Sequence, residues 1–395
     1  MYKKYTFHIL GLAHLPTSKN YLSCAFTQKI IKQAHMLADL GHTVRIYGCI
    51  GDYGLHKNIT FVETHTIDDI RSDYGDGDNR YELGYNWHAG DFRHDFNTDK
   101  RKSTIKYYAR AIQEINTVKK PDDFLVITQG VYQKTISDAV GLFLTVESGV
   151  GYRGSFARFR AFESAYLQNF TYGSEHPYES IDGNHYDRVI PNYFEPTDIE
   201  FSDQKDDYYL FIGRMIKRKG IIIAHLTAQA RKKKLIIAGQ GGLVLPDGSL
   251  TATVDPDFII PKGNWEYVGY ADLETRKKLM AHAKVTLVPT EYLEAFAGVH
   301  IESMLSGTPV VTTNFGVFGG TVIDGVNGYK ANTLQDFVDC AREAEDMNPH
   351  KVRASATKYL THSVKHQYQK WYDDLYKVWE STQDDKIKAW HRLDE

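Results

Sequence analysis

Two glutamates stand at positions from which they could bind a phosphate-linked substrate. Glu294 and Glu302 are separated by seven residues in PTEYLEAFAGVHIESMLSGTPVV (289–311), a segment that reads as strand, loop, helix, turn and strand. Backbone amides at the start of that helix can bind a diphosphate, because a helix N-terminus carries unpaired N–H groups and partial positive charge. A carboxylate within the helix can accept hydrogen bonds from ribose hydroxyls, and one in the loop can reach a sugar beyond the phosphate. The spacing alone would still favour two solvated glutamates.

Two basic residues come from YYLFIGRMIKRKG (208–220). Arg214 directly follows a predicted strand and Lys219 begins the next helix, so both cations should point from the carboxyl end of that strand toward one crevice. There they could stabilise a departing diphosphate. An arginine and a lysine at a strand end are usually surface charge. Their occurrence in the same predicted sheet as the phosphate-binding helix favours a functional role.

Six ordered segments resemble family four of the retaining glycosyltransferases, which have the GT-B fold of two Rossmann-like domains. A resemblance in six segments is specific, although any one of them alone would be weak. The segments are VIPNYF (189–194), GRMIKRKG (213–220), LIIAGQGG (235–242), WEYVGY (265–270), LEAFAGVHIES (293–303) and VIDGVNGY (322–329).

The resemblance implies a role for each of the residues above. Arg214 and Lys219 would bind the diphosphate of a nucleotide sugar, Glu294 the transferred sugar and Glu302 the ribose, with Tyr270 near the base. A UDP- or GDP-linked sugar would be the co-substrate, without a metal or other cofactor, because the two cations and the helix dipole would do the electrostatic work of a metal. Other predicted donor-binding residues are Gly213, Phe296, Ala297, Gly298, Val299, Thr17 and Ser18.

The chain also departs from the family pattern. The glycines that usually flank the phenylalanine of the glutamate motif are Ala295 and Ala297 here. The first β–α loop, HLPTSKNYLSCAFTQK, lacks the usual paired glycines, so the hydroxyls of Thr17 and Ser18 could take their place. The histidine that often ends a central strand of the N-terminal domain is replaced by Glu147. The resemblance therefore does not imply how this domain binds an acceptor or handles its proton.

The segment ESGVGYRGSF (147–156) leaves several interpretations open. Glu147 could be a catalytic general base or an electrostatic partner of the forming oxocarbenium, or it could cap the helix expected at 155–168. The segment also contains G-x-G-x-x-G between a predicted strand and that helix. With Glu175 about 20 residues further on, this pattern is the fingerprint of a dinucleotide site. An NAD-dependent enzyme is therefore a rival hypothesis.

The order of predicted elements indicates an α/β protein of the GT-B class, with two doubly wound domains facing a cleft. We expect an acceptor-side domain at 1–193, a donor-binding domain at 194–359 and a C-terminal helix at 360–395 that returns to the first domain. Predicted strands lie at 5–12, 44–47, 59–63, 124–128, 143–147, 188–191, 208–212, 235–238, 265–268, 285–289 and 309–312. Predicted helices lie at 26–40, 102–118, 155–168, 220–231, 272–283, 299–305 and 363–379.

The segment 67–97 is rich in Asp, Gly, Asn and Tyr and is predicted to be a long loop. Its aromatic residues Tyr81, Tyr85 and Trp87 could stack on a saccharide acceptor or simply pack. The same loop contains Asp76-Gly77-Asp78, which looks like the metal motif of another glycosyltransferase fold. We give that motif no metal role, because it lies in the wrong domain.

Composition limits the class of protein and of partner. The 395 residues are 42% hydrophobic and 25% charged, which is typical of two globular domains. A net charge of −3 makes a nucleic-acid acceptor less favoured than a saccharide or another small hydroxyl compound. Three scattered cysteines and a short N-terminal apolar stretch predict a cytoplasmic protein without integral membrane association. A sugar-nucleotide epimerase and an inactive nucleotide-sugar-binding protein remain alternatives to a transferase.

Overall fold

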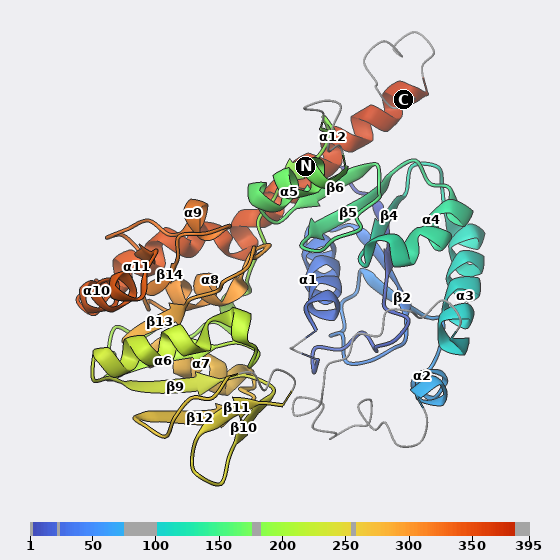
Figure 1. The fold of residues 1–395 in the computed structure, drawn as a ribbon. Helices are drawn as coiled ribbons and strands as arrows, with labels where there is room; N and C mark the ends of the chain where they lie inside the picture. The colour runs from blue at the N-terminus through green and yellow to red at the C-terminus, as the bar shows by residue number, and fades with distance from the viewer. Residues whose placement is uncertain (1–2, 22–23, 75–100, 176–182, 254–257, 384–395) are drawn as a thin grey trace. The chain divides into compact units, whose positions relative to one another are not determined.

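The computed structural model describes residues 3–21, 24–74, 101–175, 183–253 and 258–383 (Figure 1). These residues divide into two compact units. Unit 1 takes in the described residues up to Pro191 and those from Val364 onward, and unit 2 takes in Asn192–Ser363. The predicted metal-like motif at 76–78 and the aromatic residues Tyr81, Tyr85 and Trp87 lie outside the described residues.

Unit 1 is built on a seven-stranded parallel sheet in the order β3-β2-β1-β4-β5-β6-β7. The strand order reverses between β1 and β4, where Ile9 pairs with Ile46 on one side and with Val126 on the other. This reversal is the topological switch point of a doubly wound fold. The strands are β1 (Thr6–Leu10), β2 (Thr43–Gly48), β3 (Ile59–Glu63), β4 (Phe124–Ile127), β5 (Thr145–Val150), β6 (Phe159–Phe162) and β7 (Arg188–Val189).

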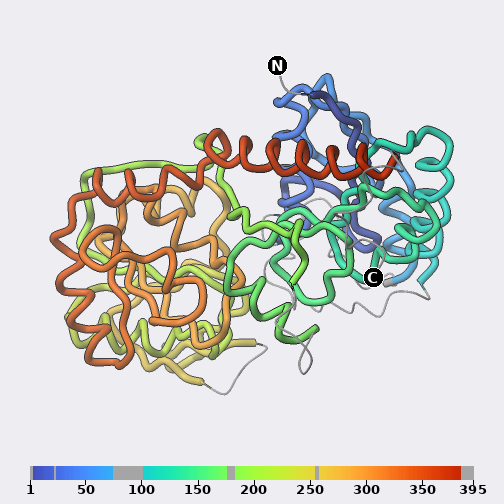
Figure 2. The backbone as a smooth tube through the Cα atoms, turned by 90° about the horizontal axis from the view of Figure 1, so that it is seen from above, coloured from blue at the N-terminus to red at the C-terminus, as the bar shows by residue number. Residues whose placement is uncertain are grey.

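Helices cover both faces of this sheet (Figure 1). On one face, α3 and α4 bury Ala111, Ile115 and Ile136 against Leu125 and Ile127 of β4. The last helix, drawn in red in Figure 2, packs Tyr372 against Phe7 of β1, with ring centroids 4.8 Å apart. The helices are α1 (Ala25–Asp39), α2 (Ile67–Tyr74), α3 (Lys102–Val118), α4 (Lys134–Val140), α5 (Ala165–Glu175) and α12 (Thr361–Thr382).

Three predictions for unit 1 were wrong. The helix expected at 155–168 is instead strand β6 followed by α5, because Phe159 and Ala161 are fully buried in the sheet and Arg160 is held by carboxylates. The loop expected at 67–97 begins with helix α2. Strand β5 continues past the expected end at Glu147 as far as Val150, with a shift in its register against β6 after Ser148.

Unit 2 repeats the same architecture with a six-stranded parallel sheet in the order β12-β9-β8-β13-β14-β15. Side chains of β8 alternate between its faces: Tyr209 and Phe211 belong to one buried cluster, and Tyr208 and Leu210 to another. Helices α6 and α10 complete the first cluster. The strands are β8 (Tyr208–Ile212), β9 (Lys234–Ala238), β12 (Trp265–Gly269), β13 (Val285–Val288), β14 (Val310–Thr313) and β15 (Gly328–Ala331).

Helices α6, α7 and α8 follow the predicted alternation, whereas strand β15 and helices α9, α10 and α11 were not predicted. An antiparallel hairpin of β10 (Gly242–Val244) and β11 (Leu250–Ala252) was not predicted and follows β9. Within the described parts of the chain, no helix is both long enough and apolar enough to span a membrane. The helices are α6 (Ile221–Ala230), α7 (Leu273–His282), α8 (Gly298–Leu305), α9 (Phe318–Thr321), α10 (Leu334–Ala344) and α11 (Pro349–Ala356).

Candidate donor site in unit 2

The candidate site lies where the strand order of unit 2 reverses. Strands β8 and β13 pair in parallel at this point, with Val285 opposite Tyr209. Gly213 and Arg214 follow the carboxyl end of β8, and the loop that leads to Glu294 follows the carboxyl end of β13. In doubly wound sheets, ligands bind at this reversal beyond the carboxyl ends of the strands. The fold therefore brings the two predicted motifs to one edge of one sheet.

Two glycines allow the loops at this edge to approach each other closely. Gly220, at φ +78°, has the carbonyl oxygen of Pro289 1.9 Å from the point that a Cβ would occupy. A Cβ on Gly239 would lie 1.7 Å from the carbonyl oxygen of Gly213. Nearby, the Glu291 N–H donates to the Arg218 carbonyl over 2.9 Å. These positions need glycine because backbone from a neighbouring loop fills the space of a side chain.

Lys219 and Glu294 form an ion pair at the centre of this edge. The lysine Nζ donates to Oε1 of Glu294, and the Thr290 hydroxyl lies 3.4 Å from the same oxygen. The two side chains are 21% and 11% exposed. Burial alone would lower the pKa of Lys219, but Glu294 and Tyr292 together raise it above its ordinary value. Lys219 is therefore a cation paired with a carboxylate at this edge of the sheet.

Tyr292 was not predicted as a site residue. Its ring lies 4.5 Å from the guanidinium of Arg218 and 5.1 Å from Nζ of Lys219, measured to the ring centroid. Burial raises the pKa of the Tyr292 hydroxyl, and the charges of Lys219 and Glu294 act on it in opposite directions. The sequence signal was its place in the loop after β13, two residues before Glu294. Cation–π contacts of this kind help to hold the basic residues in place.

The N-terminus of α8 begins beside this ion pair. Ala297 precedes the helix at φ 58° and ψ 58°, a left-handed conformation, and no side chain caps the helix. Phe296 is buried at 3% exposure and packs near Phe194 and Tyr359. The side chain of Phe296 is therefore part of the core, and only its backbone could contact a donor. Gly298 and Val299 are the first residues of the helix, as the phosphate-binding hypothesis requires.

Replacing Ala297 with glycine should stabilise the protein. An alanine in the left-handed region costs about 1–2 kcal/mol, and glycine removes this cost while adding about 0.5–1 kcal/mol of unfolded-state entropy. We expect a net gain of up to about 1 kcal/mol for Ala297→Gly, read as a higher Tm. Ala295→Gly is the matched control, because Ala295 has no positive φ and should only be destabilised. A fall in Tm for both variants would show that Ala297 is not strained.

Glu302 is paired with a residue that was not predicted. Arg276, in the first turn of α7, donates to Oε2 of Glu302. Burial raises the pKa of Tyr270 to about 12, and the nearby charge of Arg276 opposes that rise. Arg276 and Glu302 thus meet from α7 and α8, and Tyr270 directly follows β12. No spacing in the sequence linked Arg276 to Glu302, because the contact joins two different helices.

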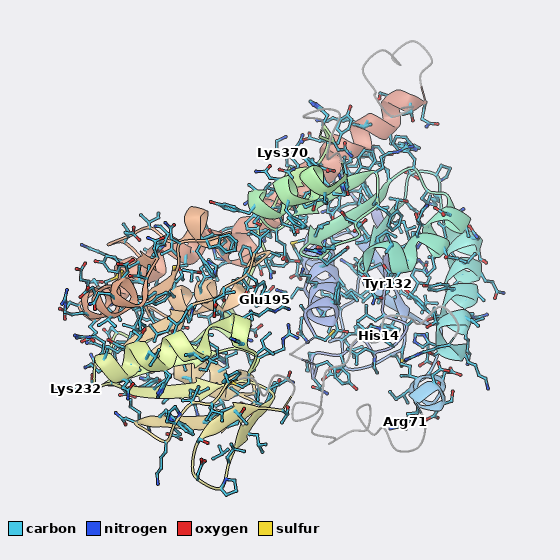
Figure 3. The ribbon with its side chains drawn as sticks, viewed as in Figure 1. His14, Arg71, Tyr132, Glu195, Lys232 and Lys370 are labelled. Carbon is cyan, nitrogen blue, oxygen red and sulfur yellow. The ribbon has the colours of Figure 1, made fainter. Side chains whose placement is uncertain are left out.

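Arg214 differs from Lys219 in having no fixed partner. Its side chain is exposed, and it makes no hydrogen bond or ion pair with the residues that the structure describes. The basic cluster at 231–234 is instead largely paired: Arg231 with Glu345, Lys233 with Asp207 and Lys234 with Glu266. In that cluster Lys232 is exposed at the end of α6 (Figure 3). This pairing agrees with a structural role for the cluster.

The structure does not show the helix cap that the sequence offered as the structural role of Glu147, because strand β6 follows instead of a helix. Oε1 of Glu147 accepts hydrogen bonds from the backbone N–H groups of Phe156 and Ala157 over 2.6 and 2.8 Å. Its Oε2 accepts the Tyr152 hydroxyl over 2.7 Å, and the side chain is 0% exposed. Burial raises the pKa of this carboxyl, whereas the three hydrogen bonds lower it. Glu147 therefore fixes the loop between β5 and β6 and does not cap a helix.

The dinucleotide interpretation of the glycine run does not fit the structure. A Rossmann fingerprint requires a helix directly after its last glycine, whereas Gly154 leads into strand β6. The proposed ribose carboxylate Glu175 is paired with Arg160 over 2.8 Å. A Cβ on Gly151 would lie 2.3 Å from Oε2 of Glu163, so side chains of unit 1 fill the space beside the run. The absence of the required helix removes the main support for an NAD site.

Thr17 and Ser18 are placed in unit 1 and are buried at 0% and 3% exposure. The Thr17 hydroxyl faces Gly11 and Gly48, at 3.4 and 3.5 Å from the points that their Cβ atoms would occupy. The Ser18 hydroxyl accepts a hydrogen bond from the Asn20 N–H over 3.2 Å. Neither hydroxyl is exposed in this structure, so their binding of a donor stays a prediction that needs a change in this loop.

Solved structures with the same architecture share little sequence with this chain. Sucrose-phosphate synthase from Thermosynechococcus elongatus is 14% identical, with a TM-score of 0.63 over 95% of this chain and all of the other. AviGT4, a glycosyltransferase involved in avilamycin A biosynthesis, is 16% identical, with a TM-score of 0.59 over 95% and 98%. Anabaena HepE, solved with UDP-glucose, is 12% identical, with a TM-score of 0.60 over 94% and 99%. The protein therefore has the GT-B fold.

Sequence comparison identifies the family of the second unit. Residues 195–360 match the family model of glycosyl transferases group 1, and this domain belongs to that family. An uncharacterized glycosyltransferase of Methanocaldococcus jannaschii is 32% identical over 125 residues, which are 30% of each chain. A glycogen synthase of Mycobacterium tuberculosis is 30% identical over 131 residues, which are 30% of this chain and 28% of the synthase. The match thus spans less than a third of the length of these relatives.

Proposed function

We propose that this protein is a retaining glycosyltransferase that moves a hexosyl group from a nucleotide sugar to a hydroxyl acceptor. The observation that carries the proposal is the Lys219–Glu294 ion pair at the strand reversal of unit 2, beside the N-terminus of α8. A donor diphosphate would replace Glu294 as the partner of Lys219, with Arg214 as a second cation. Glu294 would then be free to accept hydroxyls of the transferred sugar. The family of this domain supports the assignment.

The cations would act mainly as the glycosidic bond breaks. The bond between the sugar C1 and the phosphate oxygen is cleaved, and its electron pair stays on the diphosphate. Charge on that group therefore grows toward the transition state, where Lys219, Arg214 and the amides of Gly298 and Val299 would stabilise it. The acceptor oxygen forms the new bond to C1 on the same face of the sugar, and its hydroxyl proton passes to the departing diphosphate. The acceptor is proposed to be a saccharide or another small hydroxyl compound.

The first experiment is nucleotide release from UDP-, GDP-, ADP- and dTDP-sugars, starting with UDP-glucose because HepE was solved with it. Selective release from one donor that is lost in Arg214→Ala would support the proposal and name the donor. Release that gives a free epimerised sugar would favour an epimerase. Tight binding of one donor without turnover, even with an acceptor panel, would favour a nucleotide-sugar-binding protein. If the protein neither releases nucleotide from any donor nor binds any donor, the proposal is overturned.

Removal of divalent metal should leave nucleotide release unchanged. Two side-chain cations and a helix N-terminus can offset the diphosphate charge that a bound metal offsets in other enzymes. We therefore expect the rate in excess EDTA to stay within about a factor of two of the rate with Mg²⁺ or Mn²⁺. Lys219→Met should show whether a metal can replace the lysine. A rate that falls more than about tenfold in EDTA and returns with Mn²⁺ would contradict metal independence.

A further inference from the structure

Arg276 occupies a well-anchored position next to the candidate ribose contact. It lies in the first turn of α7, where the Asp272 side chain accepts a hydrogen bond from the Thr275 N–H over 2.8 Å and caps the helix. From this turn the Arg276 guanidinium reaches Glu302 on α8. The arginine side chain is 29% exposed and the glutamate 14%. A planar guanidinium fixes the orientation of a carboxylate better than an ammonium group can.

The ion pair uses only part of the carboxylate. Arg276 donates to Oε2 of Glu302, while Oε1 makes no hydrogen bond with any residue in the described part of the chain. Oε2 also lies 4.0 Å from the point that a Cβ on Gly298 would occupy, so the carboxylate stands beside the start of α8. Each carboxylate oxygen can accept two hydrogen bonds. Glu302 therefore keeps enough acceptor capacity for two neighbouring hydroxyls while Arg276 holds it.

We infer that Arg276 is a positioning residue for the ribose contact, and that it sets the preference of the site for ribonucleotides over 2′-deoxyribonucleotides. The inference rests on the proposed function, in which Glu302 accepts the ribose hydroxyls. Without Arg276, the Glu302 side chain would sample several rotamers. A ribose, which binds it through two hydroxyls, would then lose more affinity than a 2′-deoxyribose, which binds it through one. The charge of Arg276 also acts on Tyr270, the residue predicted to lie near the base.

The test is calorimetric titration with UDP, GDP and ADP and with their 2′-deoxy forms. For the diphosphate that binds, we expect the wild type to prefer the ribose form by about tenfold or more, as for one charge-assisted hydrogen bond. Arg276→Ala should reduce this preference to about twofold, and Arg276→Lys should restore part of it. Glu302→Ala should abolish it, and adding Arg276→Ala to that variant should change nothing further.

Arg231→Ala is the matched control for loss of an ion pair. Arg231 and Glu345 directly follow α6 and α10 and join the ends of these helices, with side chains 24% and 14% exposed, but they do not belong to the candidate site. This variant should keep the full ribose preference. Arg276→Ala with an unchanged preference would overturn the inference alone, provided that Glu302→Ala loses it. A preference that survives in Glu302→Ala, or a wild type that binds no diphosphate, would overturn the proposed donor site as well.

Discussion

Lys219→Met should lower the rate of nucleotide release by about 100-fold while weakening binding of the nucleoside diphosphate product less than about tenfold. The lysine is charged in the free protein, because Glu294 and Tyr292 raise its pKa against the effect of burial. Methionine keeps the length of the side chain and removes the charge. Since negative charge on the diphosphate increases as the bond breaks, the lost cation should cost more in the transition state than in the bound ground state.

The control for this prediction is Lys217→Met, in the same short 3₁₀ turn of Lys217–Lys219. Lys217 is exposed and is not placed in the donor site, so this variant should keep nearly the wild-type rate. Lys219→Met also leaves the Glu294 carboxylate without its ion-pair partner. The double variant Lys219→Met/Glu294→Gln removes that unpaired charge, so it separates its effect from the loss of the lysine cation. Turnover within a factor of three of the wild type in Lys219→Met would remove the lysine from the proposed machinery.

The alternating order of strands and helices made much of the fold predictable. Strands β3 and β8 and helix α3 lie at their predicted bounds, since each is a regular apolar pattern between clear breaks. The helix expected at 155–168 was wrong for a physical reason. Arg160 lies buried in β6, where it forms an ion pair with Asp187, 27 residues further along the chain. No local pattern contains a partner at that distance.

The part of the candidate site that could be predicted consists of charged residues in the segments that follow strands. Arg214, Lys219 and Glu294 lie in the segments that follow β8 and β13, so the parallel sheet brings them to one edge. The partners that orient these residues were not predictable. Arg276 meets Glu302 only through the packing of α7 on α8, and Tyr292 meets Lys219 only through the loop after β13. The sequence therefore predicts which charged residues belong to the site, whereas the residues that they contact depend on tertiary structure.

Gly220→Ala should destabilise the protein strongly and abolish donor binding. The new Cβ would lie 1.9 Å from the carbonyl oxygen of Pro289 and 2.7 Å from its carbonyl carbon, so backbone must move rather than a flexible side chain. Pro289 begins the loop that leads to Glu294, and Gly220 directly follows Lys219. The movement that relieves the clash therefore separates the two partners of the central ion pair. We expect a loss of more than about 3 kcal/mol, as for strained substitutions in a packed interior.

Gly269→Ala separates this clash from the cost of the backbone conformation itself. Gly269 has φ +72°, close to the +78° of Gly220, but no heavy atom lies within 4 Å of the point that its Cβ would occupy. It should therefore lose only about 1–2 kcal/mol, the cost of a left-handed alanine. Thermal unfolding and diphosphate titration of both variants check the prediction. Equal losses of stability would mean that conformation alone requires glycine at 220, and that the loop after β13 can move away without disturbing the site.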